Sequence, residues 1–390
     1  MAQTEQIDRV LREAVERGEV PGVVAVAGTR ERPLYQDAFG RRALPDGGAM
    51  SEDTVFWIAS MTKAITSAAA MQLVEQGRLA LDRPIAPVLP ELADPQVLEG
   101  FDSAGQPRLR PARRPITLRH LITHTAGFVY AIWNAELGRY IEKTGTPDII
   151  TCRNAALSLP LAFDPGERWD YGINIDWVGK AVERVSGRRL GDYLREHLFM
   201  PLGMNDTAFK LTSERRARLA QMHARGENGE LAPIAFEMEQ DPEFEMGGGG
   251  LYGTAADYLA FARMFLNEGR AAGGAPVLQP QTVRLMTENA IGDLRVQPLK
   301  TVAPALSNDA EFFPGMVKKW SLGFMISTEA VPGGRAAGSL AWAGLGNTYF
   351  WIDPATGVAG VILMQLLPFA DAKALAIFDR FERALYAALG

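Results

Sequence analysis

The sequence SMTK, from Ser60 to Lys63, places a hydroxyl and an amine three residues apart. A serine hydroxyl is a weak nucleophile until a neighbouring group takes its proton. At the start of a helix, residues three apart share one face, with Cβ atoms about 5–6 Å apart, so the Lys63 amine can reach the Ser60 oxygen. A lysine is a base only when neutral, and the apolar residues 55–58 favour that form by desolvation. The motif therefore predicts a nucleophilic serine with a lysine as proton acceptor.

A tyrosine in the middle of the chain could complete this pair, since S-x-x-K alone occurs by chance in many proteins. Tyr171 follows the turn-like sequence FDPGERWD. Its hydroxyl could share the Ser60 proton with Lys63 and later deliver it to a leaving group. Taken alone, a tyrosine packed on a loop is the simpler interpretation.

A predicted strand near the C-terminus contains the sequence Trp342-Ala343-Gly344. A glycine on an edge strand lets a substrate approach the backbone. The N–H groups of Leu345 and Ser60 could then form an oxyanion hole, in which two donors face the oxygen that becomes negative. Without the other two motifs, this strand would be ordinary core.

The elements that must position these residues change in type along the chain. The N-terminal part predicts an amphipathic helix, an antiparallel hairpin over residues 20–40 and a helix from Met61 that ends at Gly77. From about residue 79 to 245, short helical patterns alternate with proline-containing loops. The last third predicts four strands and a closing helix, at residues 320–328, 339–345, 348–352, 358–366 and 370–389.

Strands at both ends of the chain must find each other to bury their faces. We therefore expect an α+β fold in which residues 1–78 and 247–390 form one discontinuous α/β domain. Residues 79–246 would form an inserted helical domain, with the active site between the two domains.

Several local signals refine this organisation. Thr117 is expected to cap the helix LRHLITH, and Asn174 or Asp176 is expected to cap the helix that ends at Gly187. Thr254 is expected to cap the helix AADYLAFARMFLNEG. The glycine run 247–250 predicts close approach or flexibility beside the cleft. The arginine-rich segment 107–119 contains three prolines and predicts a solvated loop.

The composition is ordinary for a globular protein, with 47% hydrophobic and 22% charged residues in a chain of 390. The net charge of -6 is too small to indicate a nucleic-acid or anionic-membrane partner. The one cysteine, Cys152, excludes an internal disulfide, and no apolar run approaches the roughly 18 residues of a membrane span. We expect a cytoplasmic enzyme whose partner is a small-molecule ester; these features predict no particular oligomeric state.

In this order and spacing, the motifs resemble the serine β-lactamase and penicillin-binding-protein superfamily. The sequence is most similar to its esterase branch, the family VIII carboxylesterases, which resemble class C β-lactamases. The similar segments span nearly the whole chain: FWIASMTKAITSAAAMQLVEQGRLALDRPI, LRHLITHTAGF, DPGERWDYG, GGGGLYGTAADY and AWAGLGNTYFWIDP. The resemblance implies a β-lactamase/transpeptidase-like fold, with an antiparallel sheet flanked by helices and an inserted all-helical domain. It also implies Ser60 as nucleophile, Lys63 and Tyr171 as its partners, and Ser60 and Leu345 as oxyanion donors.

Two departures from the superfamily pattern point to the substrate. Relatives that process β-lactams or peptides usually have Tyr-Ser-Asn or Ser-x-Asn in the middle motif and Lys-Thr-Gly on the late strand. Here Ile173 stands in place of the amide and Trp342 in place of the lysine. Losing a charge partner and an amide partner weakens recognition of carboxylate-bearing amides. The expected substrate is therefore a neutral, apolar ester.

The expected substrate-binding residues come from this late strand, the middle motif and the loop after HTAG, which the resemblance places at the rim of the site. They are Phe128, Tyr130, Trp133, Ile173, Trp342 and Gly344.

Several functions are compatible with these residues. Hydrolysis of esters through an acyl-enzyme on Ser60 comes first, and transfer of the same acyl group to an alcohol or amine is the alternative. Weak β-lactamase or D-aminoacyl peptidase activity is a lesser version, and a non-catalytic binding protein is a different class. We do not expect the α/β-hydrolase mechanism, because no serine lies in the pattern G-x-S-x-G that it requires. His120 and His124 lack the glutamate and third ligand of a zinc site, so we expect no metal and no cofactor.

Overall fold

The computed structural model describes residues 4–390. The strands of its largest sheet are β1 (Gly22–Thr29), β2 (Pro33–Gly40), β9 (Lys318–Trp320), β10 (Met325–Ser327), β11 (Leu340–Gly344), β12 (Thr348–Asp353) and β13 (Val358–Leu363). The α-helices are α1 (Glu5–Glu16), α2 (Thr62–Glu75), α3 (Leu118–Ile122), α4 (Ala135–Thr144), α5 (Asn174–Ser186), α6 (Leu190–Leu194), α7 (Met200–Leu202), α8 (Ser213–Ala217), α9 (Ala255–Leu266), α10 (Pro280–Thr287) and α11 (Ala372–Leu389).

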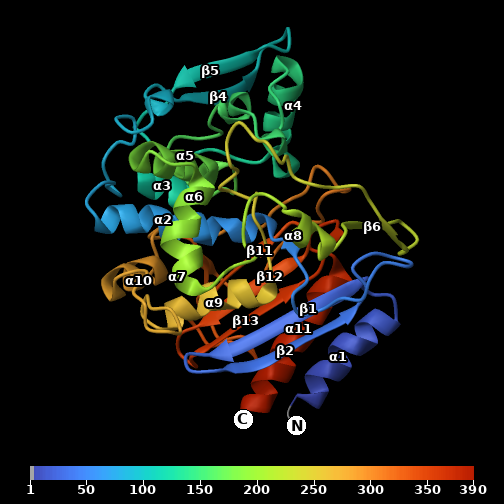
Figure 1. Ribbon diagram of the computed structural model, residues 1–390. Coiled ribbons are helices and arrows are strands. Elements are labelled where there is room, and N and C mark those ends of the chain that lie inside the picture. Colours follow the sequence, from blue (N-terminus) through green and yellow to red (C-terminus); the bar gives the residue numbers. More distant parts are fainter. Residues whose placement is uncertain (1–3) are drawn as a thin grey trace.

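The seven-stranded sheet unites both ends of the chain. Its order is β2-β1-β13-β12-β11-β10-β9, and each neighbouring pair is antiparallel (Figure 1). The register pairs Val24 of β1 with Leu363 of β13, which joins residues from the N-terminal and C-terminal parts of the sequence. The expected antiparallel sheet, built from both ends of the chain, is therefore present.

Helices cover both faces of this sheet. Successive strand residues point to opposite faces, so each strand has side chains that contact the helices on either side. In β12, Tyr349 and Trp351 contact Phe378 of α11, whereas Phe350 contacts Tyr258 of α9. Helix α1 packs beside α11 and against β2. Strands β12 and β13 are consequently buried along their whole length, which explains why their sequences are continuous apolar runs rather than alternating ones.

Helix α2 lies between α9, below it in Figure 1, and the helices α3 and α5 above it. Every residue from Thr62 to Leu73 is buried, and α2 contacts both α5 and α6. A helix with apolar residues on all sides must be enclosed on all sides. Lys63 in its first turn therefore lies in a core and not on a surface.

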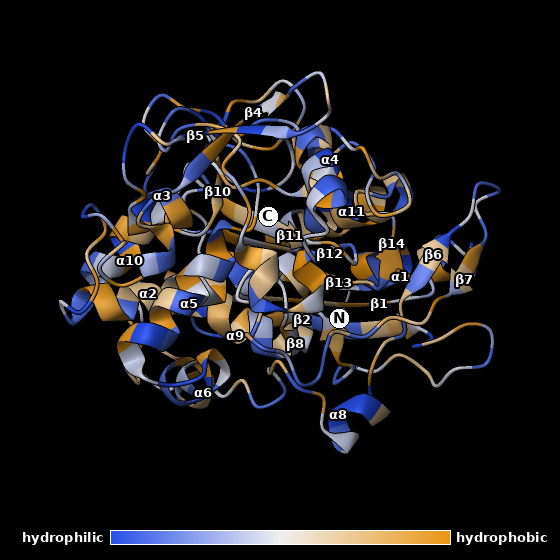
Figure 2. Cartoon of the chain, turned by 90° about the horizontal axis from the view of Figure 1, so that it is seen from above, coloured by the Kyte–Doolittle hydropathy of each residue, from blue (hydrophilic) through white to orange (hydrophobic). Residues whose placement is uncertain are grey.

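Short strands complete the structure. They are β3 (Phe56–Trp57) with β8 (Tyr252–Gly253), β4 (Gln96–Phe101) with β5 (Pro107–Pro111), and β6 (His223–Arg225) with β7 (Leu231–Pro233) and β14 (Leu366–Leu367). Seen from above, the central strands are mostly hydrophobic, whereas α8 at the periphery is largely hydrophilic (Figure 2). Within residues 4–390, no helix is long and apolar enough to cross a membrane.

Several sequence predictions of local structure are confirmed. The hairpin, the helix before Gly77 and the closing helix are β1–β2, α2 and α11. The hydroxyl of Thr117 accepts a hydrogen bond from the His120 N–H, and that of Thr254 accepts one from the Asp257 N–H, so both threonines cap their helices. The boundaries proposed for the two domains stay a prediction.

Three predictions of local structure are wrong. The single strand over 320–328 is divided into β9 and β10 by a turn at residues 321–324, where Gly323 has a φ of 129°. The first part of the arginine-rich segment, residues 107–111, forms strand β5 and not a loop, because it pairs with β4. Arg108 is exposed as expected, whereas Arg110 pairs with the fully buried Asp164. Asn174 and Asp176 do not cap α5, since the N-cap is Ile173 and both polar residues lie inside the helix.

Candidate active site

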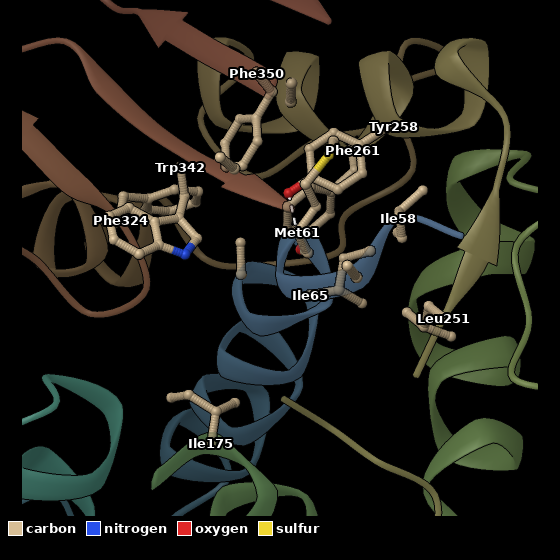
Figure 3. Close-up of a cluster of buried hydrophobic side chains, with 14 of the residues drawn as sticks. Ile58, Met61, Ile65, Ile175, Leu251, Tyr258, Phe261, Phe324, Trp342 and Phe350 are labelled. Atoms are coloured by element: carbon tan, nitrogen blue, oxygen red, sulfur yellow. Dashed lines mark hydrogen bonds between the residues drawn. The ribbon is translucent and has the colours of Figure 1, made fainter. Parts of the chain in front are cut away.

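Ser60 lies in the tight turn that joins β3 to α2. The residues Ala59–Met61 form a single 3-10 turn, and Ala59 has a φ of 45°, a left-handed conformation that costs energy in a residue other than glycine. This turn leaves Ser60 partly exposed while both neighbours are buried. The hydroxyl of Tyr258 in α9 holds the turn in place by donating to the Met61 carbonyl oxygen, at 3.0 Å (Figure 3).

The amine of Lys63 is enclosed by three oxygen atoms. Its Nζ lies 3.1 Å from the Ser60 Oγ, 3.0 Å from the Tyr130 hydroxyl oxygen and 2.6 Å from the Gly248 carbonyl oxygen. The side chain is 1% exposed, and burial lowers the pKa of Lys63 to about 7. The lysine can therefore exist as a neutral amine near neutral pH.

Both protonation states of Lys63 are compatible with these three neighbours. An ammonium group has three N–H donors, one for each oxygen. A neutral amine has two donors and one lone pair; the Gly248 carbonyl can only accept, so the lone pair is free to accept the Ser60 proton. The amine can thus take this proton without rearrangement.

Tyr171 lies beside the same lysine, although its hydroxyl has a different donor. The Trp342 indole Nε1 donates to the Tyr171 hydroxyl oxygen at 2.9 Å, and the Lys63 Nζ lies 4.7 Å from the centre of the Tyr171 ring. Burial raises the pKa of Tyr171, an effect that Ser60 and Trp342 partly oppose by hydrogen bonding. Tyr171 is therefore a neutral phenol whose oxygen faces the serine.

Tyr130 contacts the lysine directly, although its position in the sequence suggests only a pocket residue. Its hydroxyl accepts from Lys63, its backbone N–H donates to the Tyr171 carbonyl oxygen, and the two tyrosine rings lie 5.3 Å apart between centroids. No local pattern around Tyr130 identifies this contact, because it depends on how the loop folds over α2.

The end of strand β11 lies against the turn that carries Ser60. A Cβ atom added to Gly344 would lie 2.4 Å from the Ile58 carbonyl oxygen and 2.3 Å from the Thr348 Oγ1. Leu345 follows this close approach and is partly exposed. The arrangement puts the end of β11 beside Ser60, as an oxyanion hole requires; the role of the two N–H groups stays a prediction.

The glycine run 247–250 packs against α2 and supplies backbone oxygens to it. The carbonyl oxygens of Gly247, Gly248 and Gly249 accept hydrogen bonds from Thr66, Lys63 and Trp57, respectively. All four glycines are buried. The segment is therefore a close-approach wall of the site.

Asp176 is the buried acid of this region, and sequence reasoning assigned it only to a helix cap. It is fully buried in α5, and its Oδ1 accepts a hydrogen bond of 2.8 Å from the Gly248 N–H. Burial raises the pKa of Asp176 to about 6, and the neighbouring Lys63 opposes that shift. An acid five positions after Tyr171, placed between the apolar residues Ile175 and Trp177, was the available signal.

Comparisons with known proteins identify the family of the chain. A protein-family model described as beta-lactamase matches residues 7–383. This chain belongs to the beta-lactamase family. The monacolin J acid methylbutanoyltransferase of Aspergillus terreus is 33% identical over 98% of this chain and 95% of that protein. The lovastatin esterase of Penicillium rubens is 31% identical over 97% of this chain and 98% of that protein.

A solved structure extends the similarity to three dimensions. The simvastatin synthase from Aspergillus terreus superposes with a TM-score of 0.86 at 31% identity, covering 99% of this chain and 98% of that one. The relatives of this beta-lactamase-family chain thus include both acyltransferases and an esterase. By their names, these relatives either transfer an acyl group or hydrolyse an ester.

The other residues expected to bind substrate in this beta-lactamase-family chain occupy two different surroundings. Trp133 stands beside Tyr171, with ring centroids 5.6 Å apart, and its indole N–H donates to the Ser307 Oγ. Phe128 stacks on Trp177 and lines a cavity of about 610 Å³ among the helices. Ile173, 1% exposed, lies in the core before α5. The roles of these residues stay predictions.

The two histidines of the short helix α3 and the loop after it have structural contacts. The His120 Nδ1 accepts from the Thr117 N–H and completes the helix cap. His124 is fully buried, lies 3.1 Å from the Asn174 amide nitrogen, and has its pKa held well below the usual range by burial. Among residues 4–390, no group of three or more histidine, cysteine, aspartate or glutamate side chains is arranged to hold a metal ion.

Proposed function

We propose that this protein is a serine acyltransferase that takes an acyl group from a neutral, apolar ester onto Ser60 and passes it to an acceptor alcohol. The observation that carries the proposal is the 3.1 Å contact between the Ser60 Oγ and a Lys63 amine that is 1% exposed. A desolvated lysine at this distance is a general base for a serine nucleophile.

The first half-reaction would acylate the serine. Lys63 takes the Ser60 proton while the oxygen attacks the ester carbonyl, and the N–H groups of Ser60 and Leu345 receive the developing negative charge. The proton then passes to the leaving alcohol, either from Lys63 or through the Tyr171 hydroxyl. The products are a free alcohol and an acyl ester on Ser60.

The second half-reaction repeats these steps with a new nucleophile. The acceptor hydroxyl gives its proton to the Lys63 and Tyr171 pair and attacks the acyl carbonyl, and Ser60 leaves with that proton. The low exposure of Lys63, Tyr171 and Trp342 (1%, 2% and 6%) limits water around the acyl-enzyme. This limitation and the methylbutanoyltransferase relative support transfer to an alcohol over transfer to water.

Ester hydrolysis is the second candidate, because the lovastatin esterase is 31% identical over nearly all of this chain. Under that alternative the protein would be a member of the family VIII carboxylesterases. In either case we propose a neutral substrate, because Trp342 supplies an N–H to Tyr171 where a lysine would offer a positive charge. We also propose the cytoplasm as its location, since no disulfide is needed by a chain whose one cysteine is Cys152.

The test compares wild type with Ser60→Ala on p-nitrophenyl acetate, butyrate and octanoate, with and without 1-butanol. We expect nitrophenol release by wild type only, with butyl esters as the main acylated product when 1-butanol is present. If free acid remains the main product at every butanol concentration, hydrolysis is the function. If Ser60→Ala keeps most of the wild-type activity, the assigned nucleophile is wrong.

A further inference from the structure

Gly248 connects Asp176 to the lysine of the site. Its N–H donates to the Asp176 Oδ1 at 2.8 Å, and its carbonyl oxygen accepts from the Lys63 Nζ at 2.6 Å. One glycine residue thus links a buried carboxylate in α5 to a buried amine in α2.

The link depends on the absence of a side chain at position 248. A Cβ atom there would lie 2.7 Å from the Asp176 Oδ2. The carboxylate therefore lies directly against the glycine backbone. Its Oδ2 has no hydrogen-bond partner among the described residues, so the Gly248 N–H and the nearby lysine provide the main compensation for burying this group.

We propose that Asp176 is a positioning residue for Lys63: it fixes Gly248, whose carbonyl orients the amine toward Ser60, and it places a carboxylate close to that amine. The inference rests on the proposed function, because it concerns the base of that reaction. The acid is not expected to touch the substrate, since it is fully buried behind the glycine wall.

Several polar groups from different elements face Asp176 and Lys63. The groups are Ser60, His124, Tyr130, Cys152 and Tyr171. Burial raises the pKa values of both tyrosines and of Cys152, and lowers that of His124. His124, the two tyrosines and Cys152 are consequently neutral around pH 7, whereas Asp176 and Lys63 titrate there.

The sign of the effect of Asp176 follows from the charges. A negative carboxylate stabilises the ammonium form and so raises the pKa of Lys63, against the larger lowering caused by burial. Replacing the carboxylate by a neutral amide removes the opposing influence. The amine then loses its proton at lower pH and is also a weaker base.

The test is Asp176→Asn, which keeps the shape and leaves an oxygen to accept from Gly248. The rate of Ser60 labelling by an alkyl fluorophosphonate is measured from pH 5 to 9, together with kcat/KM for p-nitrophenyl butyrate. We expect the rising limb of both profiles to move to lower pH by about one unit, with a several-fold lower plateau. Mass spectrometry of the labelled peptide confirms that Ser60 reacts.

Asp257→Asn is the matched control. Asp257 is another buried acid, whose Oδ2 accepts from the Asp206 N–H and the Thr207 hydroxyl, and burial also raises its pKa to about 6. Lys63 does not influence the pKa of Asp257. The rising limb of the pH profile of Asp257→Asn should therefore coincide with that of wild type. Asp176→Ser, a smaller neutral residue, provides a second test if the asparagine variant does not fold.

The outcomes separate the two proposals. If wild-type Ser60 is labelled and Asp176→Asn retains the wild-type limb, the role of Asp176 is wrong while the proposed function stands. An equal shift in Asp257→Asn would also overturn it, because the effect would then be a general one. If wild type neither reacts with the phosphonate nor releases nitrophenol, the proposed function itself fails.

Discussion

The indole Nε1 of Trp342 donates a 2.9 Å hydrogen bond to the hydroxyl oxygen of Tyr171. The two rings also contact each other, with centroids 4.9 Å apart. The late strand therefore supplies the middle motif with a neutral donor where β-lactam-processing relatives usually have a lysine. An N–H aimed at the phenol oxygen holds the ring in place and leaves the hydroxyl proton free to point toward Ser60.

Trp342→Phe should lower kcat for p-nitrophenyl butyrate about tenfold, because it removes one neutral hydrogen bond from a proton-handling group and keeps most of the apolar contact. KM should change little. Steady-state kinetics at saturating ester measure both values.

Trp351→Phe is the control for that substitution. The Trp351 indole also donates to a tyrosine hydroxyl, that of Tyr386, but it does so on the face of β12 covered by α11. Its kcat should remain within about twofold of wild type, as expected for a change remote from the reacting atoms. A similar loss in both variants would show that the Trp342 effect comes from tryptophan removal in general.

Much of the fold follows from local patterns, and the reason is physical. Strands such as β13 are continuous apolar runs next to a strong turn, and α2 begins after an apolar strand and ends before Gly77, which has a φ of 68°. These signals depend on neighbours in sequence. The contact between Ser60 and Lys63 belongs to the same class, since helical spacing alone brings the two side chains together.

The remaining contacts of the site depend on long-range packing. Tyr130 reaches Lys63 only because its loop folds over α2, and Asp176 reaches Gly248 across 72 positions of sequence. Polar residues near the start of a helix usually cap it, which is why the sequence favoured that role for Asp176. The error with Arg110 is similar, because its buried partner Asp164 is distant in sequence.

The activity of the wild-type enzyme should rise with pH through about pH 7. Only the neutral amine of Lys63 accepts the Ser60 proton, and the neutral fraction increases as the pH passes the pKa of about 7 that burial produces. The profile of kcat/KM for a neutral ester, whose own charge does not change, measures this limb. A rate that is flat from pH 5 to 9 would contradict a titrating lysine.

Tyr130→Phe and Tyr171→Phe should differ in severity. Tyr171 faces the serine, so its loss should reduce kcat by about 10²–10³-fold, the size of a general acid–base contribution. Tyr130 only accepts a hydrogen bond from Lys63, and its loss should cost about tenfold. Single-turnover acylation rates compare the two; a larger loss in Tyr130→Phe would exchange the roles of the tyrosines.

Gly344→Ala should abolish most acylation, because the new Cβ would lie within 2.4 Å of the Ile58 carbonyl oxygen and push β11 away from the Ser60 turn. Misplacing an oxyanion donor costs about 10²–10³-fold in kcat. Gly273→Ala is the control, since nothing lies within 4 Å of the Cβ it would add. Fluorophosphonate labelling of Ser60 measures both; normal labelling of Gly344→Ala would contradict the proposed oxyanion hole.

Glu382→Gln should destabilise the fold without changing the site. Arg335 and Glu382 are 1% and 3% exposed, and the guanidinium donates to both carboxylate oxygens, at 2.8 and 2.6 Å. Because breaking one partner leaves the other charge buried and uncompensated, the free energy of unfolding should fall by about 3–5 kcal/mol. Urea-induced unfolding followed by tryptophan fluorescence measures the loss.

Asp379→Asn provides the comparison on the same helix. Asp379 pairs with Arg383 four residues later, but both side chains are about half exposed. Water and salt screen such a pair, so its loss should cost less than about 1 kcal/mol. Equal destabilisation by the two substitutions would contradict the premise that burial, and not pairing itself, makes the Arg335–Glu382 bridge costly to break. Because α11 covers the face of β12 opposite α9, both folded variants should retain wild-type kcat at 25 °C.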